Sequence, residues 1–248
     1  MVRLGLIGGT GLDHWGSPVR SHALEGPYGC PSAGLAEFQL DGLSLFFLPR
    51  HGLHHEIPPH AINYRANIDS FRQLKVDSLI AINAVGGIST RHMPGSLAIP
   101  DQLIDYTWGR EHSFSLDAAD DLAHVEFAEP FDRHLHNGLV RAASVAGVDV
   151  EADACVAVSQ GPRLETAAEI RRFRQDGCDL VGMTSMPEAA LAREAGLPYA
   201  SICVSANWAA GVQGDPISMD AIRTTLSEAM IKVRMLLNAY FKECSNVE

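Results

Sequence analysis

Residues 199–220, YASICVSANWAAGVQGDPISMD, decide the fold because a buried strand, a polar strand end and a helix start follow one another within them. The stretch opens with small and β-branched residues such as Ile202 and Val204, a composition typical of a strand buried on both faces. The apolar run stops at Asn207, and Ser218, a good N-cap residue, opens a helix. The stretch therefore predicts an α/β fold with Asn207 at the carboxyl end of a strand.

Asn207 is the candidate ligand contact of this stretch. In parallel α/β proteins, ligands lie at the carboxyl ends of the strands, so a polar residue there is placed to meet one. We interpret Asn207 as a residue that recognises a base, with the following helix start lining the far end of the same ligand. The structural alternative is that Asn207 only caps a loop, and this stretch alone leaves both readings open.

The composition is that of a soluble enzyme with a full core. Hydrophobic residues make up 46% of the 248 residues and charged residues 20%, and no linker divides them, so we expect one domain over residues 1–248. The net charge of −11, with no Lys/Arg cluster, argues against binding to nucleic acid. The five cysteines form no CxxC pair and are expected to be reduced, as in a cytoplasmic protein. We expect no signal peptide and no membrane span, since no run approaches ~18 apolar residues.

Apolar runs and helical periodicity alternate along the rest of the chain. Strands are expected over residues 2–7, 35–40, 43–48, 78–83, 97–99, 103–104, 154–158 and 180–183. Helices are expected over residues 62–75, 132–146, 187–195 and 218–241, and from the segment 159–166 through Arg174. This alternation predicts a single α/β domain whose central mixed, largely parallel β-sheet is flanked by helices. Residues 106–129 are polar and irregular, which is typical of a lid or an interface element.

Polar or glycine-rich groups follow several of these strands. The turn Gly8-Gly9-Thr10-Gly11 lets backbone N–H groups approach an anion, although it does not fit the GxGxxG dinucleotide motif. Arg50 and His51 end a later strand, and both can donate charge-assisted hydrogen bonds to a divalent anion. Zinc binding by His51 and its neighbouring histidines is not favoured, because glycine and proline residues interrupt any regular helix there and no acidic cluster completes the ligand set. Together the strand ends predict a small-molecule site.

Six motifs give the chain a resemblance to a known family. They are IGGTGL at 7–12, PRHG with two further histidines at 49–55, INYRAN at 62–67, AEPF at 128–131, GPRLETAAE at 161–169 and GMTSMPEAALAREAG at 182–196. The chain resembles the methylthioadenosine phosphorylase branch of the trimeric purine nucleoside phosphorylases. The resemblance implies a nucleoside phosphorylase-like α/β domain, a homotrimer with sites near the subunit interfaces, and no metal or organic cofactor. It also implies reversible phosphorolysis of a purine nucleoside, with inorganic phosphate as the co-substrate.

The resemblance further implies roles for individual residues. A phosphate cradle is implied for Thr10, Arg50, His51, Asn83, the backbone of Ala84, and Thr184. Asn83 stands where this branch usually has threonine, so its role is less closely fixed. Met183 would contact the ribose through its backbone, and His124, before AEPF, would reach into the site of a neighbouring subunit.

Two residues at the base differ from the methylthioadenosine branch. Asn207 stands where that branch has aspartate, and both Asn207 and Glu165 are similar to the 6-oxopurine nucleoside phosphorylases. The Asn207 amide can donate to O6 of hypoxanthine and accept the N7 proton, while ionised Glu165 can accept N1–H. Adenine would place a lone pair against Glu165, and an unpaired buried polar contact costs ~1–3 kcal/mol. A 6-oxopurine is therefore expected, with Asn207, Glu165 and His51 as the catalytic residues.

At the ribose 5′ end, the residues differ instead from those of the 6-oxopurine nucleoside phosphorylases. Ile222 stands where the 6-oxopurine enzymes place a histidine that meets the 5′-hydroxyl, and Met219 lies on the same helix face. Neither side chain hydrogen-bonds a hydroxyl well, and burying one methyl group is worth ~0.8 kcal/mol. The combination points to 5′-methylthioinosine. The structural alternative is that Met219 and Ile222 simply face the core.

Three other functions stay open at this point. The nearest is phosphorolysis of 5′-methylthioadenosine, with Asn207 and Glu165 tolerating adenine. The next is a general inosine/guanosine phosphorylase. A nucleoside-binding protein without turnover is a third, which the retained phosphate residues Thr10, Arg50, His51 and Thr184 disfavour.

Overall fold

Two long strands, β5 (Ser78–Gly87) and β10 (Tyr199–Trp208), run parallel to each other through the middle of the molecule. The computed structural model describes residues 1–40, 42–115, 124–213 and 218–245. Most residues of both strands are buried, which explains the continuous apolar runs in their sequence.

Eight further strands complete the sheet in the described part of the chain. They are β1 (Val2–Gly8), β2 (Arg20–His22), β3 (Leu35–Leu40), β4 (Leu43–Pro49), β6 (Leu97–Ala98), β7 (Gln102–Asp105), β8 (Cys155–Val158) and β9 (Leu180–Gly182). The order is β2-β3-β4-β1-β5-β9-β8-β7, with β10 paired to β5 and β6. The pairs β1–β4, β1–β5, β5–β10, β7–β8 and β8–β9 are parallel and the others antiparallel. The mixed, largely parallel sheet expected from the sequence is confirmed.

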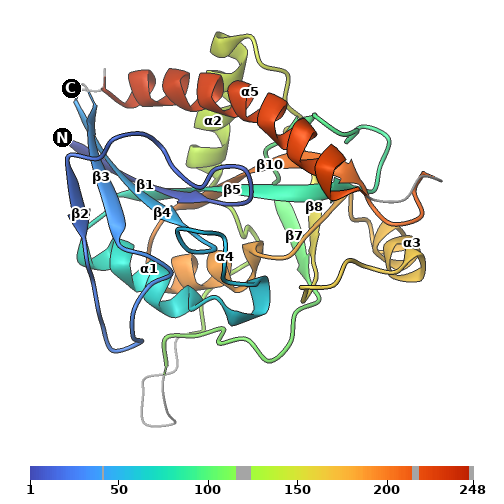
Figure 1. Cartoon of the computed structure of the whole chain (residues 1–248), viewed down its shortest axis with the longest axis horizontal. Coiled ribbons are helices and arrows are strands. Elements are labelled where there is room, and N and C mark those ends of the chain that lie inside the picture. Colours follow the sequence, from blue (N-terminus) through green and yellow to red (C-terminus); the bar gives the residue numbers. More distant parts are fainter. Residues whose placement is uncertain (41, 116–123, 214–217, 246–248) are drawn as a thin grey trace.

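Helices cover both faces of the sheet (Figure 1). On one face, α2 (Arg133–Ala146) packs with α5 (Met219–Ser245), and on the other α1 (Tyr64–Gln73) packs with α4 (Ser185–Glu194). The shorter α3 (Ala167–Gln175) lies against β8 and β9, and a 3-10 turn (Pro59–Ala61) precedes α1. Among the described residues, no helix is long and apolar enough to cross a membrane.

Several element ends differ from the sequence prediction. The sequence predicts that the last strand stops by Asn207, but β10 continues through Trp208, because it keeps pairing with β5, which itself extends to Gly87. The strand β2 is not predicted, because its three residues are half-exposed or exposed and show no apolar run. The hairpin of β3 and β4 is confirmed, with Asp41 of its turn outside the described residues.

Candidate active site

A cavity of ≈ 450 Å³ lies where several strand ends meet the start of α5. Ten of the predicted site residues line it: Thr10, Arg50, His51, Ala84, Glu165, Met183, Thr184, Asn207, Met219 and Ile222. The residues come from β5 and β10, from the turns after β1, β4, β8 and β9, and from α5. The arrangement follows the rule that open α/β sheets bind ligands beyond the carboxyl ends of their strands.

Arg50 is 1% exposed and is held by a buried carboxylate. Its Nε and Nη2 donate to the two carboxylate oxygens of Glu188 at 2.7 and 2.9 Å, and Nη1 donates to the carbonyl of Ile82 at 3.0 Å. Glu188 lies on α4, is 0% exposed, and also accepts a hydrogen bond from the Tyr199 hydroxyl at 2.8 Å. This two-point contact fixes the plane of the guanidinium and leaves N–H hydrogens on Nη1 and Nη2 for a ligand.

Gly9 lets the turn after β1 approach Arg50 closely. A Cβ at this position would lie 2.4 Å from the carbonyl oxygen of Ile82 and 2.8 Å from Nη1 of Arg50. Only glycine fits such an approach without moving its neighbours. The turn expected from the sequence thereby brings Thr10 to the cavity wall beside Arg50.

His51 is uncharged in this site. Its Nδ1 lies 2.8 Å from the carbonyl oxygen of Ile57, so Nδ1 carries the proton and donates it there. Burial, assisted by the charge of Arg50, lowers the pKa of His51 to about 4. The sequence predicts a charge-assisted donor to phosphate at this position, and that role of His51 stays a prediction. The side chain offers the lone pair of Nε2, which suits a hydroxyl group or a protonated phosphate oxygen.

Asn83 supports Thr184 and does not line the cavity. The Thr184 hydroxyl donates to Oδ1 of Asn83 at 2.9 Å, and Nδ2 of Asn83 donates to the Ser201 hydroxyl at 2.6 Å. Both ends of this buried amide are occupied. Within the protein Asn83 orients Thr184, and its direct contact with phosphate stays a prediction.

Glu165 and Asn207 supply the polar groups expected to recognise a base. The Ser159 hydroxyl donates to the Glu165 carboxylate at 2.5 Å, and burial raises the pKa of Glu165 above its usual range. Nδ2 of Asn207 donates to the carbonyl of Trp208 at 2.7 Å, which leaves Oδ1 and one amide hydrogen for a ligand. The register of β10 against β5 shifts between Ser205 and Asn207, a β-bulge that re-aims the Asn207 side chain.

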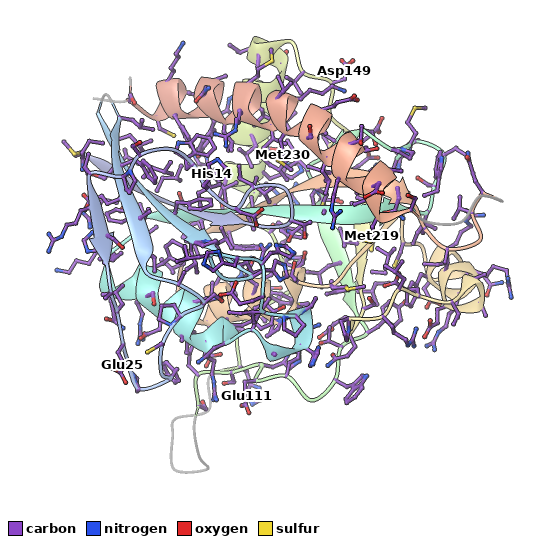
Figure 2. All side chains as sticks on the ribbon, in the orientation of Figure 1. His14, Glu25, Glu111, Asp149, Met219 and Met230 are labelled. Carbon is purple, nitrogen blue, oxygen red and sulfur yellow. The ribbon has the colours of Figure 1, made fainter. Side chains whose placement is uncertain are left out.

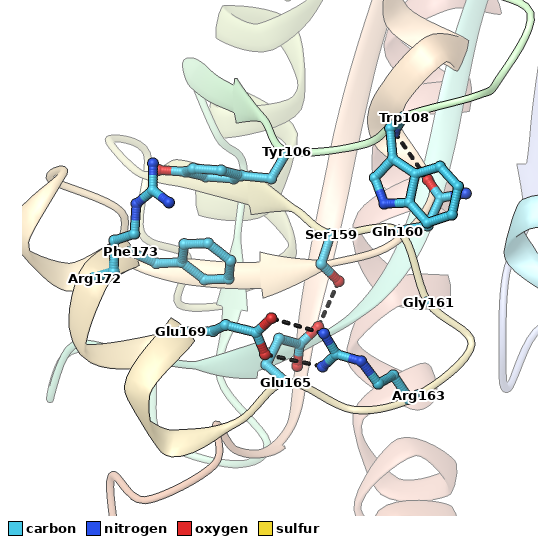
Figure 3. Close-up of a pocket in the computed structure, with 10 residues that line it drawn as sticks. All are labelled: Tyr106, Trp108, Ser159, Gln160, Gly161, Arg163, Glu165, Glu169, Arg172 and Phe173. Carbon is cyan, nitrogen blue, oxygen red and sulfur yellow. Dashed lines mark hydrogen bonds and ion pairs between the residues drawn. The ribbon is translucent and has the colours of Figure 1, made fainter.

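Glu165 also lines a second, smaller cavity of ≈ 280 Å³ (Figure 3). The aromatic residues on its walls are Tyr106, Trp108 and Phe173. Two of its charged groups are paired with each other, since Arg163 donates to both oxygens of Glu169 at 2.9 and 2.7 Å. The backbone N–H of Trp108 donates to Oε1 of Gln160 at 3.1 Å, which attaches the segment after β7 to the turn after β8.

Met219 and Ile222 form an apolar wall on the first turn of α5. Figure 2 shows Met219 at this end of the helix. Met219 is 57% exposed, whereas Ile222 is 9% exposed and also packs in the core with Leu226. Both side chains line the cavity, so for Ile222 the core reading and the site reading hold together.

His124 is exposed and lies outside the cavity. The residues just before it, 116–123, fall outside the described part of the chain, so its contact with a neighbouring subunit stays a prediction. Within the described residues, no group of three or more His, Cys, Asp or Glu side chains is placed to hold a metal ion.

Sequence reasoning missed Glu188 and Arg110, which hold the site together. Glu188 lies within the motif at 182–196, and a single carboxylate in an apolar helix face is the signal that points to a buried partner. Arg110 lies in the irregular segment after β7, where no local pattern marks it.

The comparisons with known proteins agree with this geometry. The chain matches the description "Phosphorylase superfamily" over residues 3–242. It is 47% identical over 234 residues to a curated protein of Xanthomonas campestris pv. campestris named "Probable S-methyl-5'-thioinosine phosphorylase", covering 94% of this chain and 91% of that protein. It is 37% identical over 237 residues to the S-methyl-5'-thioadenosine phosphorylase of Pyrococcus abyssi, covering 96% and 91%. The solved methylthioadenosine phosphorylase of Schistosoma mansoni in complex with adenine superposes with a TM-score of 0.94 at 30% identity, covering 98% and 92%.

Proposed function

The chain belongs to the phosphorylase superfamily, and on that premise we propose that it converts 5′-methylthioinosine and phosphate to hypoxanthine and 5-methylthioribose 1-phosphate. The observation that carries this proposal is one cavity with two unlike ends. Asn207 and Glu165 offer groups complementary to a 6-oxopurine, whereas Met219 and Ile222 offer an apolar wall for a methylthio group. The similarity to the Xanthomonas protein supports the same reaction.

Phosphate would bind between these two ends. Arg50, already oriented by Glu188, would donate to the phosphate oxygens together with the hydroxyl of Thr10. Because His51 is neutral, its Nε2 would accept a hydrogen bond from a protonated phosphate oxygen or a ribose hydroxyl. Ala84 and Thr184 would close the cradle.

The reaction would proceed by displacement at C1′ of the ribosyl ring. A phosphate oxygen bonds to C1′ while the bond from C1′ to N9 breaks, and the bonding electron pair leaves with the purine. Positive charge on the ribosyl ring is stabilised by the adjacent phosphate. The proton that hydrogen phosphate gives up on forming the ester passes through water to N7 of the departing purine, where Asn207 Oδ1 accepts the N7–H hydrogen bond, while Glu165 accepts N1–H.

We further propose that the enzyme is a cytoplasmic homotrimer of single-domain subunits that needs no metal or organic cofactor. All five cysteines are free thiols, which suits a reducing compartment. The apolar side chains of Trp108, Leu164 and Met219 are exposed around the two cavities, and a subunit contact would cover them.

The test is phosphate-dependent release of free base from four nucleosides: methylthioinosine, methylthioadenosine, inosine and adenosine. A preference for methylthioinosine supports both ends of the proposed pocket. A preference for methylthioadenosine would contradict the roles of Asn207 and Glu165, and a preference for inosine would contradict those of Met219 and Ile222.

The variant Asn207→Asp examines the base end directly. The aspartate has no amide hydrogen to donate to O6 of the purine, so this buried acceptor is left without a partner. We expect kcat/KM for methylthioinosine to fall by about 10²–10³-fold, and the ratio of kcat/KM for adenine nucleosides to that for methylthioinosine to rise. The control is Asn137→Asp, the same chemical change on the exposed surface of α2. Equal rates for Asn207→Asp and the wild-type protein on both substrates would refute the assignment.

A further inference from the structure

Arg110 joins turns that lie on different sides of the cavity. Its Nη2 donates to the carbonyl of Gln160 at 2.7 Å, in the turn that leads to Glu165. Its Nη1 donates to the carbonyls of Met183 and Met186 at 2.8 and 2.5 Å, in the turn after β9 and the first turn of α4. One side chain thus binds the turn carrying the base-recognition carboxylate and the turn carrying the ribose and phosphate contacts.

Arg110 is also connected, through the hydroxyl of Tyr64, to the loop that contains Pro59. Nη1 of Arg110 donates to the Tyr64 hydroxyl at 3.2 Å, and that hydroxyl donates to the carbonyl of Pro59 at 2.9 Å. Pro59 lines the cavity close to Ile57, whose carbonyl accepts the proton of His51. The guanidinium is therefore connected, directly or through one hydroxyl, to three separate loops of the site.

All the acceptors of Arg110 are neutral. They are backbone carbonyls and one hydroxyl, and among the described residues Arg110 makes no ion pair with a carboxylate. Arg50, in contrast, is compensated by Glu188, and His51 carries no charge. Arg110 is thus a half-buried cation with no carboxylate in contact, bound to residues that line a cavity expected to receive phosphate, in a chain with a net charge of −11.

We propose that Arg110 is a positioning residue that aligns the turn 159–165 with the turn 183–186 and adds positive charge to the phosphate site. The forked guanidinium suits this task, because its two terminal nitrogens bind two turns at once. A lysine would keep the charge but offer a single nitrogen. The proposal rests on the proposed phosphorolysis for its kinetic part, while the alignment of the two turns stands independently of the reaction.

The test compares Arg110→Met and Arg110→Lys with the matched control Arg3→Met. Arg3 is also half-buried and donates through Nε and Nη2 to one backbone carbonyl, that of Leu74, at 2.9 and 2.7 Å, away from the cavity. The readouts are amide hydrogen exchange in peptides covering 159–165 and 183–186, and the steady-state constants for nucleoside and phosphate.

Arg110→Met should accelerate exchange in both turns, raise the KM for phosphate, and lower kcat/KM for the nucleoside by about 10²-fold, the usual cost of small misplacements. Arg110→Lys should recover part of the phosphate KM but little of kcat, since it restores the charge and not the fork. Arg3→Met should leave both turns and all constants within about twofold of the wild-type values.

Unchanged exchange in both turns in the two Arg110 variants would overturn the alignment. A loss of activity no larger than that of Arg3→Met would overturn the kinetic role. A wild-type protein without any phosphorolysis would refute the proposed function, and hydrogen exchange would still decide whether Arg110 aligns the turns.

Discussion

His51 links the protonation of one side chain to the stability of the whole fold. Its pKa of about 4 in the folded protein lies below the ordinary value of 6.5, so between these pH values the unfolded chain binds a proton that the folded chain does not. The contribution of neutral His51 to the unfolding free energy is therefore complete above pH 6.5. It is lost progressively as the pH falls from 6.5 to about 4. This contribution is up to about 3 kcal/mol.

The variant His51→Gln should flatten this pH dependence, because glutamine can still donate to the carbonyl of Ile57 but does not titrate. Urea unfolding of wild-type and variant protein near pH 4.5 and pH 7 measures the difference. His14→Gln, at an exposed histidine, serves as the control. If wild-type and His51→Gln proteins lose stability equally on acidification, the neutral state of His51 in the fold is wrong.

The sequence identifies ten of the residues that line the cavity but not the residues that hold them in place. Arg50 and His51 are visible because they follow a strand directly. The partners that orient the site arginines are distant in the chain: Glu188 lies 138 positions from Arg50, and Met183 lies 73 positions from Arg110. Such contacts arise from packing of the finished fold, and no local pattern encodes them.

The first turn of α5 sets the chemistry of one end of the cavity. The variant Ile222→Ser removes apolar surface from the wall and adds a hydroxyl that can pair with a ribose 5′-hydroxyl. We expect the ratio of kcat/KM for methylthioinosine to that for inosine to fall by about 10–30-fold, since a lost methyl contact and a stranded hydroxyl each contribute ~1 kcal/mol. A ratio within one protein is insensitive to losses in the amount of folded enzyme.

Ile231→Ser is the matched control for this prediction. Ile231 lies on the same helix but is 63% exposed and does not line the cavity. The same exchange there should leave the substrate ratio unchanged. A ratio that stays constant in Ile222→Ser as well would return Ile222 to a purely structural role and remove the argument for a methylthio group.

Strands can be predicted from the sequence where burial produces an apolar run. Their ends cannot be predicted where hydrogen-bonded pairing with a neighbouring strand sets the length. The buried runs of β1, β4 and β8 are all evident from their composition. The extra length of β10 is not, because residues through Trp208 are held by pairing with the glycine-rich end of β5 and include a bulge. That bulge is what directs Asn207, so the feature least accessible to sequence reasoning is the one that aims the base contact.

The predicted role of His124 depends on whether the protein forms a trimer. In a single chain, His124 is exposed and outside the cavity, so it can serve a site only if a neighbouring subunit supplies it. Closed rings of identical subunits place the same residue of each chain at the next chain's site. We expect sedimentation equilibrium of the wild-type protein to report a trimer.

Mixed trimers should separate the two halves of such a shared site. His124→Ala and Asn207→Asp subunits should each be poorly active on methylthioinosine alone, since every site lacks either its neighbour's histidine or its own amide. When the two are co-expressed in equal amounts and assemble at random, about a quarter of the sites combine an intact Asn207 with an intact neighbouring His124, and activity should return to that fraction. Trimers that form but regain no activity would show that His124 acts within its own chain, because only a residue contributed across the interface can be complemented in this way, and His124→Ala trimers that are fully active alone would show that His124 has no role.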